Sequence, residues 1–259
     1  MSSTLAIQVG NLARRSVVRT LRQPAMVVPS LLFPLLLLAI NSGGLHSATR
    51  LPGFPTNSYL TFALAVCFVQ GALFAAMSAG TNVANDVETG FLNRLALTPL
   101  RHAALLVGQL AGVVMLGLIQ ALTFVTVGAI AGAHFKAGVA GAALIVLLSL
   151  LISLGFGSLG AFAALRSGSA EAVQGIFPLM FAALFLSSQA LPRALIEQDW
   201  FRTVATYNPV SYMLEGVRSL LITGWDGKAL ALAFGLAGAL AAVMLTAASF
   251  ALRTRMTRT

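Results

Sequence analysis

Six apolar runs, each close to or longer than the thickness of a bilayer, constrain this chain more than any other feature. A helix crosses the hydrocarbon core of a membrane with about 20 apolar residues. Charged residues lie almost entirely between these runs and at the two termini, as is typical of a protein that crosses the membrane several times. The sequence therefore predicts an all-α integral membrane protein with six transmembrane helices, at about 25–44, 58–82, 103–133, 138–165, 172–191 and 228–251.

The composition agrees with a chain that is in lipid for much of its length. Of the 259 residues, 58% are hydrophobic and 9% are charged, and the mean hydropathy is +0.89. A soluble domain usually carries about 25% charged residues. We therefore interpret residues 1–259 as a single transmembrane domain. The net charge of +9 does not indicate nucleic-acid binding, because the arginines border apolar runs and are not interleaved with aromatic residues on a soluble face.

Lysine and arginine residues predict the orientation. Ten of them fall on the side that holds both termini and six on the other side, so the positive-inside rule places both termini in the cytoplasm. A cleaved signal peptide is the competing interpretation of the N-terminus. About 22 residues precede the first apolar run and the cleavage context near Ser47 and Ala48 is poor, which disfavours cleavage.

Residues 4–22 have the pattern of a helix that lies at the membrane surface. One row along this helix is apolar and a second row carries arginines, including Arg15, Arg19 and Arg22. This arrangement is typical of an interfacial helix whose arginines meet anionic lipid. An ordinary basic leader that obeys the positive-inside rule is the alternative.

The segment NDVETGFLNRLALTPLRH, residues 85–102, is half charged and half apolar. Asn85 or Asp86 is placed to cap a helix, with Glu88 completing a capping box, and Pro99 is placed to end it. We expect a short helix at about 86–99, and we interpret it as a docking surface for a second protein. A second interfacial helix is the alternative, and the two acids disfavour it because they would face an anionic leaflet.

A second unusual stretch, about 192–224, precedes the last apolar run. It contains YNPVSYMLEGVRSLLITG, in which Asn208 is placed as a helix cap and Pro209 as the first helical residue. Glu215 and Arg218 are three residues apart and share a face of this helix. The helix is too short and too polar to span a bilayer, so it is either a re-entrant element packed on the other helices or an extracellular amphipathic loop.

The predicted spans carry no charged residue at a clearly central position. Ion-coupled transporters usually need such groups, so the pattern suits a neutral or amphipathic cargo. The sequence contains no phosphate-binding loop, hydrolase motif or metal-spaced cluster, so we predict no catalytic, metal or cofactor site in this chain. Glycines four apart, as at Gly108 and Gly112, permit close helix packing. The candidates for a cargo path are Gln70, Gln120, Phe177 and Ser187.

Taken together, the sequence resembles the six-span permease subunits of bacterial ABC exporters, the superfamily of daunorubicin-resistance and polysaccharide-export permeases. The resemblance is carried by the basic leader, by NDVETGFLNRLALTPLRHAALLVGQL, by LRSGSAEAVQGIFPLMFAALFLSSQALP and by YNPVSYMLEGVRSLL. These stretches cover nearly the whole chain in the expected order.

The resemblance implies a subunit that moves an amphipathic drug, lipid or glycolipid outward across a bacterial inner membrane. It implies two copies of a separate ATPase subunit, which hold ATP and Mg, and a second permease copy. The helix at 86–99 would couple the ATPase to the spans, through Asp86, Glu88, Gly90, Leu92, Arg94, Leu95 and Pro99. Two other classes stay open: a membrane enzyme acting on lipid, which lacks a recognisable catalytic group here, and a non-transporting sensor or assembly scaffold.

Overall fold

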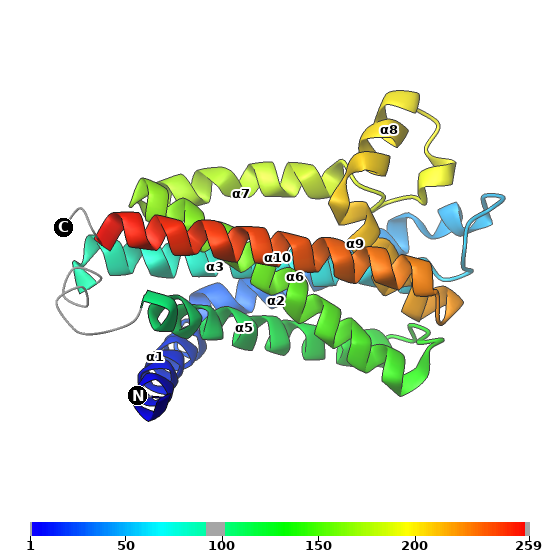
Figure 1. Cartoon of the computed structure of the whole chain (residues 1–259). Helices are drawn as coiled ribbons and strands as arrows, with labels where there is room; N and C mark the ends of the chain where they lie inside the picture. The colour runs from blue at the N-terminus through cyan, green and yellow to red at the C-terminus, as the bar shows by residue number, and fades with distance from the viewer. Residues whose placement is uncertain (1, 92–101, 257–259) are drawn as a thin grey trace.

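The computed structural model describes residues 2–91 and 102–256, and every regular element in these ranges is helical. Figure 1 shows the arrangement. The elements in chain order are α1 (Ser2–Leu21), α2 (Pro24–Gly44), η1 (His46–Arg50), α3 (Tyr59–Glu88), α5 (His102–Ile130), α6 (Gly138–Ser167), α7 (Ala170–Phe185), η2 (Arg193–Leu195), α8 (Asp199–Tyr207), α9 (Pro209–Arg218), the π-helical turn η3 (Ser219–Thr223) and α10 (Gly227–Met256).

Five of the described helices are long and apolar enough to cross a membrane: α2, α3, α5, α6 and α10. In Figure 1 both chain termini lie at one end of the bundle, here called the terminal end, and α8 and α9 lie at the opposite end, here called the α9 end. The all-α fold is confirmed. The fifth predicted span, 172–191, is not, because α7 has only 16 residues.

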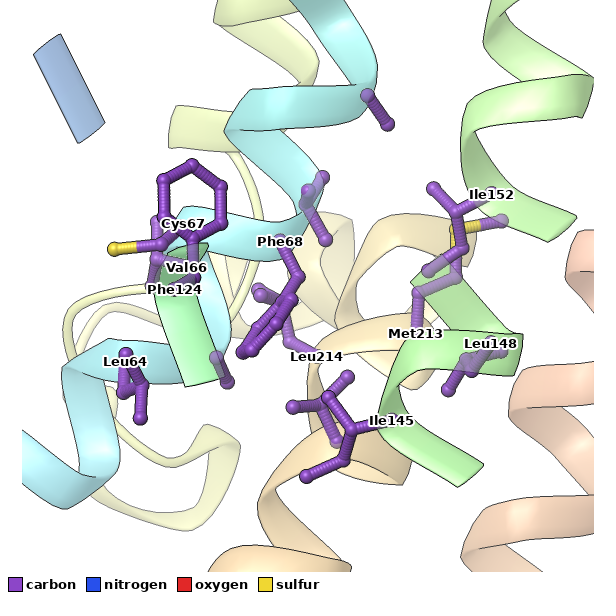
Figure 2. Close-up of a cluster of buried hydrophobic side chains, with 14 of the residues drawn as sticks. Leu64, Val66, Cys67, Phe68, Phe124, Ile145, Leu148, Ile152, Met213 and Leu214 are labelled. Atoms are coloured by element: carbon purple, nitrogen blue, oxygen red, sulfur yellow. The ribbon is translucent and has the colours of Figure 1, made fainter. Parts of the chain in front are cut away.

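Helix α3 forms the centre of the bundle. In its most apolar stretch 83% of the residues are buried, against 17% in α2 and in α10. Helix α3 is therefore enclosed by protein, whereas α2 and α10 lie at the periphery. Figure 2 shows the core around α3, where side chains from α3, α5, α6 and α9 meet; they include Leu64, Phe68, Phe124, Ile145, Leu148, Ile152, Met213 and Leu214.

Two glycines allow α3 and α6 to approach closely. A Cβ atom added to Gly80 would lie 2.9 Å from the carbonyl oxygen of Gly160, and one added to Gly160 would collide with the carbonyl group of Ala76. Real Cβ atoms do not come this close to backbone atoms, so small residues at this crossing are a requirement of the packing.

Glycines also seat α1 on α5. A Cβ atom at Gly112 would lie 2.6 Å from the Ser16 hydroxyl oxygen, and this hydroxyl donates a hydrogen bond of 2.8 Å to the Gln109 carbonyl. The predicted helix at 4–22 therefore exists as α1, and it packs on protein along the face that carries Leu12 and Ser16. The expected close packing at Gly108 and Gly112 occurs, with α1 as the partner.

Two helix ends differ from the prediction, and both lie near the polar clusters described below. Helix α3 continues to Glu88, and Gly90 with φ of +65° follows its last turn. Helix α7 stops at Phe185 although apolar residues continue to Leu186. Gly90, in the left-handed region, ends α3 locally, whereas residues far away in the sequence bind the carbonyls that follow α7.

Candidate functional site

The first polar cluster lies at the terminal end and is centred on Asp86, in the last turn of α3. The carboxylate side chain is only 7% exposed and accepts hydrogen bonds from Arg19 at 2.9 Å and Arg15 at 3.1 Å. The Gln109 amide of α5 donates to its second oxygen at 3.3 Å. We call these four residues the Asp86 cluster. Burial of a carboxylate is costly without such partners, so the cluster ties α1 and α5 to the end of α3.

This geometry corrects two expectations. Asp86 does not cap a new helix, because α3 runs through it and Thr89 and Gly90 follow the last turn. Its carboxylate faces α1 and is not free to face a second protein. Arg15 and Arg19, expected to meet anionic lipid, are turned toward Asp86 because a buried carboxylate needs a counter-charge.

The remaining polar atoms of this region are only partly satisfied. A cavity of about 30 Å³ lies among α1, α3, α5 and α6, and its lining includes Asp86, Asn82 and Gln109. The side-chain oxygens of Asn82 and Gln109 are buried without a hydrogen-bond partner in the structure. A space of this size accommodates about one water molecule, so it is too small for a cargo molecule.

Glu88 and Gly90 complete the described part of the predicted docking segment. The Glu88 carboxylate accepts a hydrogen bond of 3.3 Å from the backbone N–H of Ala170, the first residue of α7. A carboxylate at a helix N-terminus also interacts favourably with the helix dipole. Glu88 therefore links the end of α3 to the start of α7. The remaining predicted docking residues, Leu92, Arg94, Leu95 and Pro99, lie outside the described residues.

The three polar residues predicted to line a cargo path are buried in the structure. Gln70 and Gln120 are each 2% exposed and Ser187 is 1% exposed. The Gln120 amide has no hydrogen-bond partner for either polar atom. Phe177 is half-buried and belongs to an aromatic group with Phe74 and Phe181, at centroid distances of 5.4 and 4.8 Å. In this conformation the three polar candidates are enclosed among helices.

The second polar cluster lies at the α9 end and begins with Asn208. Its side-chain oxygen accepts a hydrogen bond of 2.9 Å from the N–H of Val210, and Pro209 is the first residue of α9. The predicted cap and helix start are confirmed. The Asn208 amide also donates to the carbonyls of Ala183 at 2.6 Å and Leu186 at 3.1 Å, which the sequence did not reveal.

Arg218, at the end of α9, is buried almost as completely as Asp86. Its residue is 6% exposed and its guanidinium donates to the carbonyls of Phe62 at 3.1 Å, Ser188 at 2.6 Å and Gln189 at 2.7 Å. The guanidinium carbon also lies 3.5 Å from the centroid of the Phe62 ring. Such a position combines charge-assisted hydrogen bonds with a cation–π contact.

Glu215 and Arg218 line the same pocket, as their predicted shared face implies, but they do not form an ion pair with each other. Glu215 forms its ion pair with Arg193, which precedes α8 in the chain, and the Arg193 guanidinium lies 4.4 Å from the centroid of the Tyr212 ring. Burial acts to lower the pKa of Arg193, but the hydrogen bond with Tyr212 and the charge of Glu215 raise it above its ordinary value overall. Arg218 instead points into the bundle because carbonyls without helical partners lie there.

The hydrogen-bonding partners Arg15, Arg19, Arg193 and Tyr59 were missed by sequence reasoning. The spacing of Arg15 and Arg19 places them on one helix face, and the sequence alone predicts that this face meets anionic lipid. Tyr59 at the start of α3 donates a hydrogen bond of 2.9 Å to the carbonyl of Ala190. No local sequence pattern predicts that contact.

The sequence of this chain is similar to those of known transport proteins. A family model described as ABC-2 type transporter matches residues 7–222. A putative transport permease, ycf38, of Porphyra purpurea is 27% identical over 223 residues, which cover 85% of this chain and 76% of that protein. A probable doxorubicin resistance ABC transporter permease protein, DrrC, of Mycobacterium tuberculosis is 23% identical over 157 residues, covering 59% of this chain and 56% of that protein. The family match includes α9 and the predicted docking segment.

Proposed function

This chain belongs to the ABC-2 type transporter family, and from that membership we propose that it is the permease subunit of an exporter driven by separate ATPase subunits. The match over residues 7–222 is the observation that carries the proposal. The family itself implies a multi-pass transmembrane subunit that is not an enzyme. The direction of transport, the cargo and the assembly are the further parts of the proposal.

We infer that the cargo is an amphipathic drug, lipid or glycolipid. The described spans are apolar, and one relative carries the name of a doxorubicin resistance permease. The polar side chains inside the spans, such as Gln70 and Gln120, are uncharged. An uncharged lining favours cargo that moves without coupled ions.

The proposed topology has six crossings, with α7 as the fifth. Both termini lie at the same end of the bundle in Figure 1, and an even number of crossings accounts for this. The 16 residues of α7 span about 24 Å at 1.5 Å per residue. The non-helical residues that follow it can extend this reach. Lysine and arginine counts support a cytoplasmic location for the terminal end, in a bacterial inner membrane.

We propose that the ATPase docks at the terminal end, next to the Asp86 cluster. Residues 92–101 leave α3 directly after Glu88 and Gly90 and return to α5 at His102. A force on this segment would reach α1 through Asp86 and α7 through Glu88. Two ATPase copies, which bind ATP and Mg, and a second copy of this chain complete the proposed assembly. Asp86 and Glu88 then act as transmitting residues inside the permease rather than as contacts with the ATPase.

Reconstitution with the partner tests this function. The chain is co-purified with an ABC ATPase subunit from the same organism, reconstituted in sealed liposomes, and tested with doxorubicin as an amphipathic probe. We expect a stable complex whose ATP hydrolysis rises with the probe, and no ATP binding by the chain alone. A complex that hydrolyses ATP at one rate with all amphipathic probes and moves none of them would favour the alternative, a non-transporting sensor or scaffold.

A further inference from the structure

The chain between α7 and η2 is not helical, although it lies against the core. Ser187 and Ser188 are 1% and 0% exposed, and helix α7 ends at Phe185. We call residues 186–190 the post-α7 segment. Figure 1 shows that this end of α7 lies beside the start of α9 at the α9 end. Its buried backbone groups need partners other than helical ones.

Side chains from two other helices supply those partners. Asn208 of α9 donates to the carbonyl of Leu186, and Arg218 donates to the carbonyls of Ser188 and Gln189. Tyr59 of α3 donates to the carbonyl of Ala190 at 2.9 Å. The N–H of Ser188 donates to the Ser211 hydroxyl at 3.1 Å. Side chains from these two regions thus supply partners for four carbonyls and one N–H of the segment.

Arg218 differs from the other partners because it carries a charge and joins two elements. It holds the post-α7 segment and, through the carbonyl of Phe62, also holds α3. Within the described residues no carboxylate oxygen lies within 4.0 Å of its nitrogens. An apolar side chain would fill such a position at lower cost in free energy, so packing alone does not account for an arginine there.

A cavity and an irregular turn lie directly beside this arginine. The cavity has a volume of about 240 Å³, and Phe62, Glu215 and Arg218 are part of its lining. The π-helical turn η3 starts at Ser219 and is followed by Gly224, which has φ of +102°. Single π-turns mark places where a helix is adapted for function. Arg218 is therefore at a junction between a cavity, a turn and an unwound segment.

We propose that Arg218 is a positioning residue that latches the post-α7 segment to α3. Hydrogen bonds from a charged donor are strong in a dry, low-dielectric setting and weaken when water competes for the same carbonyls. The latch would hold the α9 end in the closed arrangement, with the post-α7 segment against α3. This inference rests on the proposed function for its role in transport, whereas the latch itself does not depend on the ATPase.

The test measures the position of the post-α7 segment directly. Spin labels are attached to cysteines at Asn57 and Leu186 in a Cys67→Ser background, because Ser keeps the donor that faces the Pro34 carbonyl. The chain is reconstituted alone in phosphatidylethanolamine–phosphatidylglycerol nanodiscs and diluted with unlabelled chain. Pulsed electron resonance then gives the distance distribution between the labels. The variants are Arg218→Met, Arg218→Lys and Tyr59→Phe, and the control is Arg202→Met, an exposed arginine of α8.

We expect one narrow distance population in the parent and in Arg202→Met. Arg218→Met should add a second, longer population, with the ratio of open to closed shifted by at least about tenfold for each charged hydrogen bond that is lost. Arg218→Lys should restore part of the closed population, because lysine keeps the charge and three donors but lacks the fixed fork. Tyr59→Phe should give the smallest shift. A purely structural role would produce the same loss for Lys and Met.

Identical distributions for the parent and Arg218→Met would overturn the latch. If Arg218→Met cannot be purified, then Arg218→Lys and Tyr59→Phe decide, and parental distributions for both would also overturn it. In the complex with the ATPase, release should raise ATP hydrolysis without cargo. A distance shift without any ATPase coupling would preserve the latch and refute the proposed function, whereas normal coupling without a shift would refute the latch alone.

Discussion

The Asp86 cluster and Arg218 each place a charged group in a buried position, and the two buried charges are opposite in sign. At the terminal end a buried carboxylate is matched by two guanidinium groups from α1, and at the α9 end a buried guanidinium is matched by three backbone carbonyls. The first arrangement is an ion pair between side chains, so its strength depends on having both partners. The second is an interaction of one charge with dipoles, so removing the charge leaves neutral carbonyls and no unpaired charge.

This difference suggests different tasks for the two ends. The Asp86 cluster joins α1, α3 and α5 through groups that are costly to separate, so we expect these three helices to move together. Arg218 holds a non-helical segment through hydrogen bonds to its carbonyls alone. The terminal end would therefore move as a unit, and the α9 end would open and close. Each prediction below tests one side of this comparison, and they run from the largest expected effect to the smallest.

The first prediction tests which end faces the cytoplasm. Single cysteines at Ser47, beyond α2, and Ser167, at the end of α6, are introduced in the Cys67→Ser background; both positions are exposed. In intact cells an impermeant thiol reagent should label the Ser47 site and leave the Ser167 site unlabelled. After lysis both should react. The reverse pattern in intact cells would exchange the two ends and remove the Asp86 cluster from the ATPase.

The second prediction concerns the carboxylate at the terminal end. Asp86→Asn removes the counter-charge of Arg15 and Arg19, and we expect a loss of about 3 kcal/mol in the free energy of unfolding. The value is at the low end for a broken buried pair because Arg15 keeps 42% of its side chain exposed. Thermal unfolding in detergent measures the change.

Asp199→Asn is the matched control for this substitution. Asp199 pairs with Arg202 in α8, but its side chain is 85% exposed, and exposed pairs contribute about 0–1 kcal/mol. Equal losses for the two variants would mean that Asp86 is no more important than a surface acid, and the terminal end would lose its rigid centre.

The third prediction concerns the proposed docking segment. Leu92→Ala with Leu95→Ala removes two apolar anchors, each of which typically contributes about 1–2 kcal/mol when buried at an interface. One anchor corresponds to roughly 5- to 30-fold in the association constant. The double variant should insert normally but recover less ATPase and lose probe-stimulated hydrolysis. Leu97→Ala, which falls on another helical face in the expected pattern, is the control; unchanged recovery in the double variant would reduce the segment to an interfacial helix.

The two ends of the bundle also differ in how well the sequence predicted their structure. Asn208 and Pro209 gave the start of α9 because a cap and a first-turn proline act on neighbouring residues. Asp86 was misassigned because its partners Arg15 and Arg19 lie 71 and 67 residues away. The local sequence pattern predicted Asp86 as a helix cap. In the structure it lies inside α3 and pairs with two distant arginines.

The same reason explains the end of α7. Apolar residues continue past Phe185, so hydropathy extends the span to 191. The helix can stop at Phe185 because Asn208 and Arg218, 22 to 30 residues further on, donate hydrogen bonds to the carbonyls of Leu186 and Ser188 that follow it. The six apolar runs gave the helices and their order, whereas the polar contacts between them required the folded chain.

The smallest effect separates the two roles of Asn208. As a cap it accepts from Val210, and as a bridge it donates to Ala183 and Leu186. Asn208→Ser keeps an acceptor for the cap and is too short to reach the carbonyls of α7. We expect Ser to cost about 1 kcal/mol through the lost bridge, and Ala about 1 kcal/mol more through the lost cap. Only the bridge bears on the latch, so Ser should raise the released population of the post-α7 segment as much as Ala does. If Ser behaves like the parent in unfolding and in label distance, then Asn208 is a cap alone, and the hold on the segment belongs to Arg218 and Tyr59.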